Sequence, residues 1–283
     1  MPLVLAKIAF TPLLLAMCTF VARRWGESAG GWLLGLPLTS GPVSVFLFAQ
    51  YGSSFAEKAA RSTLLGLVAG AAFCTCYALV ASRMRWWQSL GVAYAVCLAI
   101  AWVLSLAQLS LAQSLPFVIG ALALLALVMG AVPDEGRSSA GDCDTGGDVP
   151  ARPGRVVGLL VRMLVATASV VVVTTVAGLL GPGVGGLLAP LPVLVAVMAT
   201  SSHRRGAKSE ARGLLRGAVV GAWGGVAFFA AVAVLLPTTG PLVTYGIATT
   251  SALVAGAVAM GVHERDGAWR AVKGLVVRST RLA

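Results

Sequence analysis

Long apolar runs, separated by short polar segments, follow one another along most of this chain. Nine of these runs are long enough to cross a hydrocarbon layer of about 30 Å as α-helices. The fourth and fifth are divided by a short polar turn that contains Gln108 and Gln113. The sequence therefore predicts an all-α, polytopic membrane protein with spans at approximately 3–22, 30–50, 62–81, 86–106, 114–132, 156–178, 184–200, 213–236 and 241–262.

The composition agrees with this pattern. Of the 283 residues, 58% are hydrophobic and 11% are charged, and the mean hydropathy is +0.90. Soluble domains have about 25% charged residues, and apolar runs recur along the whole chain, which excludes a soluble domain with one anchor. The alternating pattern of an outer-membrane barrel does not occur.

The second half of the chain repeats the first. Gly, Pro and basic positions coincide at an offset of 155 residues, and after a four-residue deletion they coincide again at 151. Gly, Pro, Arg and Tyr carry this conclusion, because Leu, Val and Ala dominate any membrane segment. The matched pairs are Lys7 with Arg162, Gly30 with Gly185, Gly31 with Gly186, Pro37 with Pro192, Ala60 with Ala211, Arg61 with Arg212, Gly66 with Gly217, Gly70 with Gly221 and Tyr94 with Tyr245.

Loop cations indicate the orientation, because cytoplasmic segments retain Lys and Arg during insertion. With the N-terminus outside and the C-terminus in the cytoplasm of a bacterial inner membrane, only Lys58 and Arg61 fall in outer segments. The corresponding first helices are then five crossings apart, so we expect the two units to be inverted. The predicted cytoplasmic cations are Arg23, Arg24, Arg83, Arg85, Arg137, Arg152, Arg155, Arg204, Arg205, Lys208, Arg212, Arg216 and those of the tail.

The predicted organisation is four helices, one linking helix and four inverted helices. Residues 1–113 form the first four-helix repeat, 114–155 the linking helix and an acidic cytoplasmic loop, and 156–262 the second repeat. Residues 263–283 carry cations and apolar side chains at helical spacing, which predicts a basic amphipathic tail on the anionic inner leaflet. The net charge of +11 thus reflects topology and contact with the lipid bilayer, and nothing indicates a nucleic-acid partner.

Gly- and Pro-rich segments interrupt the second and seventh predicted spans at matching places. Proline leaves backbone carbonyls that hydrocarbon cannot satisfy, so each break must face protein or a wet cavity. Paired breaks in inverted repeats are typical of a transport site, whereas a kink used only for packing is the alternative. The candidate substrate-binding residues here are Gly35, Pro37, Thr39, Ser40, Gly41, Pro42, Gly185, Gly186, Pro190 and Pro192.

Four matched cations, Lys7, Arg61, Arg162 and Arg212, are further candidates for contact with an anionic solute. Lys7 and Arg162 lie in the first helix of each unit, where snorkelling to an interface is the alternative. Arg61 and Arg212 fall at the predicted start of each third helix, where the helix dipole disfavours a cation. For Arg61 the alternative is an ordinary i, i+4 ion pair with Glu57.

Few other side chains inside the predicted spans could bind an ion or take part in catalysis. All ten acidic residues fall in loops, turns or the tail. Proton-coupled export of cations generally needs an embedded carboxylate, so an anionic, zwitterionic or neutral solute is favoured. The five cysteines, together with His203 and His263 in predicted cytoplasmic segments, lack metal-site or metalloprotease spacing. We expect no catalytic residue, no metal site and no cofactor.

Glycines four residues apart mark the third and eighth spans, at Gly66 and Gly70 and at Gly217 and Gly221. Small residues at this spacing let helices approach closely. The pattern predicts packing near the axis that relates the two units, or contact with a second copy or another membrane protein.

The second unit contains Gly186-Leu-Leu-Ala-Pro-Leu-Pro192, followed by an apolar run, a charged turn and Leu214-Leu-Arg-Gly217. Over about one hundred residues around these motifs, it resembles the small four-helix bacterial membrane proteins of the GlpM type. The first unit shares only Gly35-Leu36-Pro37. The resemblance implies a tandem, inverted fusion of two GlpM-like units, and it brings no activity and no functional residue with it.

Two functions are compatible with these patterns. The first is a transporter or exporter of a small non-cationic solute that works by alternating access between inverted repeats. The second is a scaffold or assembly factor for cell-envelope biosynthesis, which would grip partner helices through its glycine faces. An enzyme is disfavoured, because no set of nucleophile, base or metal ligands is present.

Overall fold

The computed structural model describes residues 24–25, 27–38, 40–107, 109–131 and 181–282. Within these ranges the chain is helical and contains no strand. The helices are α2 (Glu27–Gly35), α3 (Ser40–Tyr51), α4 (Ser53–Val80), α5 (Trp86–Leu106), α6 (Leu111–Ala131), α8 (Gly181–Leu188), α9 (Val193–Arg204), α10 (Lys208–Leu235) and α11 (Pro241–Leu282).

Seven segments of the described ranges have the length and composition of membrane spans. Two of them are interrupted: Ser28–Tyr51 consists of α2 and α3, and Gly183–Arg204 consists of α8 and α9. The seven coincide with the second to fifth and the seventh to ninth predicted spans. The other two, 3–22 and 156–178, lie outside the described residues. The all-α class is therefore confirmed, with several helices suited to crossing a membrane.

Two long helices begin earlier than hydrophobicity predicts. Helix α4 begins at Ser53 and α10 at Lys208, whereas the apolar windows begin near 62 and 213. A hydropathy window reports contact with hydrocarbon, but a helix continues into the interface, where charged side chains are tolerated. Arg61 and Arg212 therefore lie inside their helices, and the prediction that they stand at helix starts is wrong.

The C-terminal residues also differ from the prediction. Helix α11 runs without interruption from Pro241 to Leu282, so residues 263–282 continue the last span as one helix. No proline falls within this stretch to end the helix once it leaves the apolar window.

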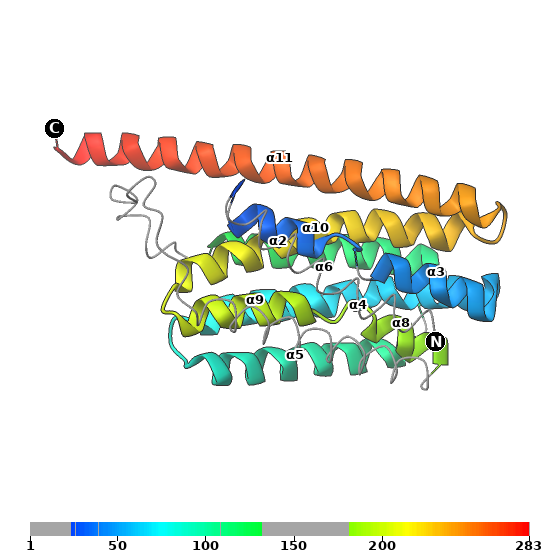
Figure 1. The fold of residues 1–283 in the computed structure, drawn as a ribbon. Coiled ribbons are helices and arrows are strands. Elements are labelled where there is room, and N and C mark those ends of the chain that lie inside the picture. The colour runs from blue at the N-terminus through cyan, green and yellow to red at the C-terminus, as the bar shows by residue number, and fades with distance from the viewer. Residues whose placement is uncertain (1–23, 26, 39, 108, 132–180, 283) are drawn as a thin grey trace, which may run out of the picture.

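Helices α4 and α10 form the centre of the bundle and run in opposite directions (Figure 1). In their most apolar windows, 78% and 67% of the residues are buried, compared with 22–28% for α5, α6 and α11. Helix α2 packs on α10 and α8 packs on α4, while α5 flanks α4, α11 flanks α10, and α6 contacts both central helices. The outer helices consequently carry the exposed apolar surface that lipid would cover.

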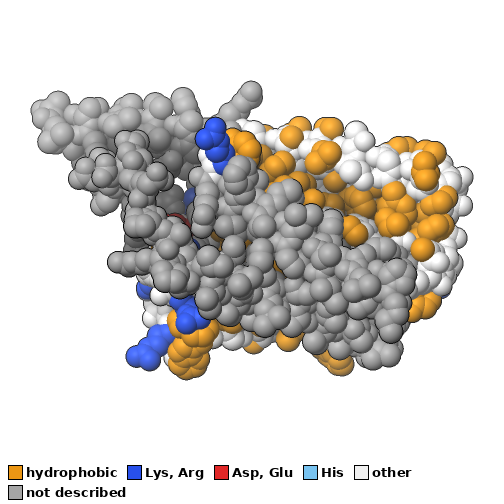
Figure 2. Space-filling view, in the orientation of Figure 1, with side chains coloured by type: hydrophobic (Ala, Val, Ile, Leu, Met, Phe, Trp, Pro, Cys, Tyr) orange, Lys and Arg blue, Asp and Glu red, His pale blue; other side chains and the backbone are white. Residues whose placement is uncertain are grey.

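At one end of the bundle, basic side chains beside the turn between α9 and α10 contact the turn between α4 and α5. Lys208 Nζ donates a hydrogen bond to the carbonyl of Ser82 at 3.3 Å, and the Arg204 guanidinium lies 5.0 Å from the ring centroid of Trp86. Figure 2 shows Lys and Arg side chains gathered toward this end on the face in view, with hydrophobic side chains over the rest of the described surface. The end of α4 thus lies beside the start of α10, as antiparallel packing requires.

Candidate functional site

The first helix break separates α2 from α3 around Pro37. Proline has no N–H, so the carbonyl of Leu33 loses its α-helical donor. The N–H of Leu38 turns back to the carbonyl of Leu36 at 2.7 Å, and the N–H of Gly41 donates to the carbonyl of Pro37 at 2.8 Å. A three-residue turn at Pro37 therefore replaces a helical turn.

The second break, between α8 and α9, has the same backbone hydrogen bonds. The N–H of Val193 donates to Leu191 at 2.8 Å, and that of Ala196 donates to Pro192 at 2.8 Å. Pro192 has φ of −80° and ψ of 54°, close to the inverse γ-turn. Each of these residues stands 155 positions after its counterpart in the first break. The two breaks thus share a proline and two backbone hydrogen bonds at matching positions, although the second also has Pro190 where the first has Gly35.

Both breaks border one cavity of about 100 Å³ between α4 and α10. Residues from both ends of each broken helix line it, together with small side chains of the two central helices. The lining consists of Leu34, Gly35, Leu36, Pro37, Ser40, Val43, Leu67, Gly70, Ala71, Cys74, Ala189, Pro190, Leu191, Pro192, Val193, Leu194, Val195, Ala218 and Ala222. Freed backbone groups therefore lie at the edge of a space large enough for a small molecule.

Half of the predicted break residues line this cavity, and four others that the structure describes do not. The lining includes Gly35, Pro37, Ser40, Pro190 and Pro192. It does not include Gly41, Pro42, Gly185 or Gly186. Thr39, Lys7 and Arg162 lie outside the described residues.

Gly41 and Gly186 serve helix packing. A Cβ atom on Gly41 would lie 3.4 Å from the ring of Phe228, and one on Gly186 would lie 2.3 Å from the carbonyl oxygen of Ala59. Both glycines thus hold a broken helix against a neighbouring helix.

Ser40 and Cys74 supply the polar side chains among the described residues that line the cavity. Ser40 is 6% exposed, and no residue that the structure describes bonds to its hydroxyl. Ser40 borders the cavity, so its hydroxyl could bond to a solute that has a hydrogen-bonding group. Across the described ranges, no three His, Cys, Asp or Glu side chains gather closely enough to hold a metal ion.

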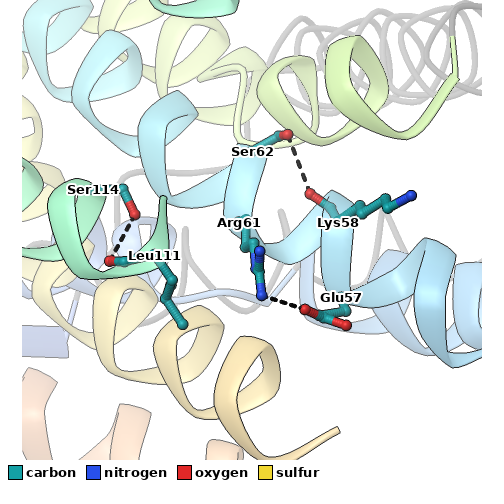
Figure 3. Close-up of polar contacts among 6 residues, drawn as sticks. All are labelled: Glu57, Lys58, Arg61, Ser62, Leu111 and Ser114. Carbon is teal, nitrogen blue, oxygen red and sulfur yellow. Dashed lines mark hydrogen bonds and ion pairs between the residues drawn. The ribbon is translucent and has the colours of Figure 1, made fainter. Parts of the chain in front are cut away.

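Neither described arginine of the predicted set lines the cavity. Arg61 is exposed on α4 and forms the expected i, i+4 ion pair with Glu57 (Figure 3). One residue further on, the hydroxyl of Ser62 donates to the carbonyl of Lys58 at 3.2 Å. Arg212 is buried in α10, with 6% of its surface exposed.

Glycines bring each broken helix into close contact with the central helix of the other half. At six of them a Cβ atom would lie 1.9–2.4 Å from a backbone carbonyl oxygen. Three of the six, Gly66, Gly217 and Gly221, belong to the predicted packing faces. The contacts are Gly31 with Leu214, Gly35 with Ala218, Gly66 with Leu187, Gly186 with Ala59, Gly217 with Ser28 and Gly221 with Trp32. Other helices of the same chain therefore cover these glycines, and a second protein would reach them only by displacing α2 or α8.

Sequence reasoning missed two hydrogen-bonded tyrosines. His203, expected in a cytoplasmic segment, is 7% exposed within α9 and contacts Tyr77 of α4, while Tyr245 of α11 contacts Ser44 of α3. No local signal was available, because the contacting residues are 126 and 201 positions apart in the sequence.

No protein-family model, curated protein or solved structure matches the chain. The resemblance to GlpM-type proteins accordingly stays a prediction.

Proposed function

We propose that this protein is a membrane transporter or exporter of a small non-cationic solute that works by alternating access between two inverted four-helix units. The observation that carries the proposal is the meeting of two equivalent helix breaks at one cavity. In transporters built from inverted repeats, broken helices expose backbone groups at a site between the repeats. The solute would lie between Pro37 and Pro192.

The glycine contacts support the inverted repeat. The contact of Gly31 with Leu214 corresponds to that of Gly186 with Ala59, and the contact of Gly221 with Trp32 corresponds to that of Gly66 with Leu187. In both cases the residues are related by a shift of 155 positions. The offset thus stays constant through α4 and α10, whose ends are also 155 apart, and these helices need no four-residue deletion.

Opposite helix directions support the same proposal. Helix α4 runs against α10, and the pair formed by α2 and α3 runs against the pair formed by α8 and α9 (Figure 1). A repeat whose copies run in opposite directions offers the same site two equivalent ways of opening. Rotation of the half-helices α3 and α9 about their proline turns would expose the cavity to one face at a time.

The membrane placement is part of the proposal. We assign the end that carries Arg83, Arg204 and Lys208 to the cytoplasm of a bacterial cell, with the N-terminus outside and the C-terminus inside. The contacts of Lys208 with Ser82 and of Arg204 with Trp86 gather these cations at one end. Lys58 and Arg61 lie near the start of α4, at the other end, where Glu57 pairs with Arg61.

A solute screen tests the function. Small neutral, zwitterionic and anionic compounds would be added to the purified protein, and a true solute near 100 times its Kd should raise Tm by about 5 °C. Each compound that stabilises the protein would then be tested for uptake into proteoliposomes. Binding and uptake of the same compound support transport. Failure of the whole panel, with a membrane protein that co-purifies, would favour the assembly factor.

Ser40→Ala should weaken the affinity for that solute by roughly two- to tenfold, the value of one hydrogen bond. Ser114→Ala is the matched control, because Ser114 is also buried but donates to the carbonyl of Leu111 within α6, at 3.1 Å (Figure 3). Titration calorimetry on both variants measures the difference. Equal affinity in the two variants would remove Ser40 from the site.

A further inference from the structure

One hydrogen-bonded contact fastens each half-helix that follows a break. On α9, His203 Nδ1 lies 3.1 Å from the hydroxyl of Tyr77 on α4. On α3, the hydroxyl of Ser44 lies 3.1 Å from that of Tyr245 on α11, which also donates to the carbonyl of Ser44 at 3.0 Å. In both cases the half-helix belongs to one predicted repeat and the tyrosine to the other.

These contacts lie on opposite sides of the cavity. Cys74 lines the cavity, and Tyr77 follows one turn later on α4, toward the end that carries Arg204. Val43 lines the cavity, and Ser44 follows it on α3 and contacts Tyr245 near the start of α11. Tyr77 is fully buried, so its contact with His203 lies inside the bundle, between Cys74 and the basic end.

An aromatic ring packs beside each tyrosine. Phe73 of α4 packs against Tyr77 with ring centroids 6.0 Å apart, and Phe228 of α10 packs against Tyr245 at 6.3 Å. Phe228 stands 155 positions after Phe73.

The same shift relates the residues on the half-helices. His203 stands 155 positions after Phe48, and Phe48 lies 6.4 Å from the ring of Tyr245 while His203 lies 5.9 Å from that of Tyr77. The half-helices therefore correspond, whereas the two tyrosines lie on helices that do not, because α4 corresponds to α10 and not to α11.

We infer that these contacts are the two gates of the cavity: Tyr77 with His203 closes it toward the basic end, and Tyr245 with Ser44 closes it toward the opposite end. The inference rests on the proposed transport function and adds the residues that would control it. Alternating access requires one barrier to open while the other stays shut. Each half-helix can rotate about its proline turn, and one polar contact holds it in place. One half-helix could therefore move while the other stays fixed.

The thiol of Cys74 provides a test that needs no knowledge of the solute. Cys18, Cys76, Cys97 and Cys143 would be replaced with Ser, and the protein would be placed in oriented vesicles. A membrane-impermeant methanethiosulfonate would be added to one face at a time, and the rate of Cys74 modification measured by mass spectrometry. Cys74 is 3% exposed and borders the cavity, so its modification reports an open path.

Tyr77→Phe should raise the modification rate about three- to tenfold from the basic face alone, because it removes one hydrogen bond from that gate. Tyr245→Phe should do the same from the opposite face alone. Tyr94→Phe is the matched control, since no described residue bonds to its hydroxyl, and it should leave both rates unchanged. Rates that do not change, or that rise equally from both faces, would overturn the inference.

Partner variants guard against loss of folding in a tyrosine variant. His203→Phe should reproduce Tyr77→Phe, and Ser44→Ala should give a smaller effect than Tyr245→Phe because the bond to the Ser44 carbonyl remains. Disagreement within either pair at an unchanged Tm would contradict the assignment. Face-specific labelling without uptake of any solute would refute transport but leave the gates in place. Uptake without face-specific labelling would refute the gates but leave transport in place.

Discussion

Replacing Pro192 with Ala is expected to lower solute uptake more than tenfold while leaving the amount of protein in the membrane nearly unchanged. Alanine restores an N–H and removes the ring that clashes with the preceding turn, and it favours a helix interior over proline by about 3 kcal/mol. Helices α8 and α9 would then tend to join into one helix. The γ-turn at Pro192, with its bond from Val193 to Leu191, would disappear.

Loss of this turn should affect function more than folding. A continuous helix redirects the N–H of Val193 toward the carbonyl of Ala189, which lines the cavity, so a polar group is withdrawn from the site. It also removes the hinge about which α9 would rotate. Pro190 remains as a kink in the joined helix, because it has no N–H to donate to the carbonyl of Gly186. The N–H that residue 192 gains can donate to the carbonyl of Leu188, so the substitution itself adds no unsatisfied group in the membrane.

Pro37→Ala should give a loss of similar size, because both breaks border the same cavity and have the same hydrogen bonds. Pro116→Ala is the matched control, since Pro116 also lies inside a helix, α6, but is exposed and does not line the cavity. Initial uptake rates, normalised to protein in the vesicle, measure the three variants. Normal uptake in both break variants, or equal loss in the control, would show that the breaks serve packing only.

The sequence predicted the breaks well because their cause is local. A proline in an apolar run removes one hydrogen bond wherever the helix packs, so Pro37 and Pro192 mark the interruptions without knowledge of any neighbour. The ion pair of Arg61 with Glu57 was equally accessible, since residues four apart lie on one face of a helix.

Other features were hidden because their causes are not local. His203 and Tyr77 are separated by 126 residues, and nothing in either segment indicates that α9 lies on α4. The early starts of α4 and α10 were missed because hydropathy measures preference for lipid, whereas a helix ends according to its own backbone. The constant offset of 155 also became visible only when glycine contacts showed which residues correspond.

Gly31→Ala is expected to destabilise the protein by about 3 kcal/mol or more. The added Cβ atom would lie 1.9 Å from the carbonyl oxygen of Leu214 and 2.9 Å from its Cα atom, so α2 must move away from α10. Overpacking in a rigid core costs about 1–3 kcal/mol, and here the obstacle is backbone, which cannot change rotamer. Gly186→Ala, with Ala59 as the obstacle at 2.3 Å, should have a similar effect.

Gly120→Ala is expected to stabilise the protein, unlike Gly31→Ala and Gly186→Ala. Gly120 lies inside α6, and nothing in the described part of the chain comes within 4 Å of a Cβ atom there. Alanine then contributes only its better helix propensity, about 0.5–1 kcal/mol of stabilisation. Melting temperatures in one detergent should therefore fall for Gly31→Ala and Gly186→Ala and stay level or rise for Gly120→Ala.

This comparison also separates the two functions that the sequence left open. If the glycine faces bind another protein, alanine at Gly31 or Gly186 should release that protein while the isolated chain keeps its Tm. If the faces join the two halves of this chain, Tm itself should fall. A preserved Tm would mean that α2 and α8 do not hold the central helices together, and the two breaks would then have no fixed cavity to share.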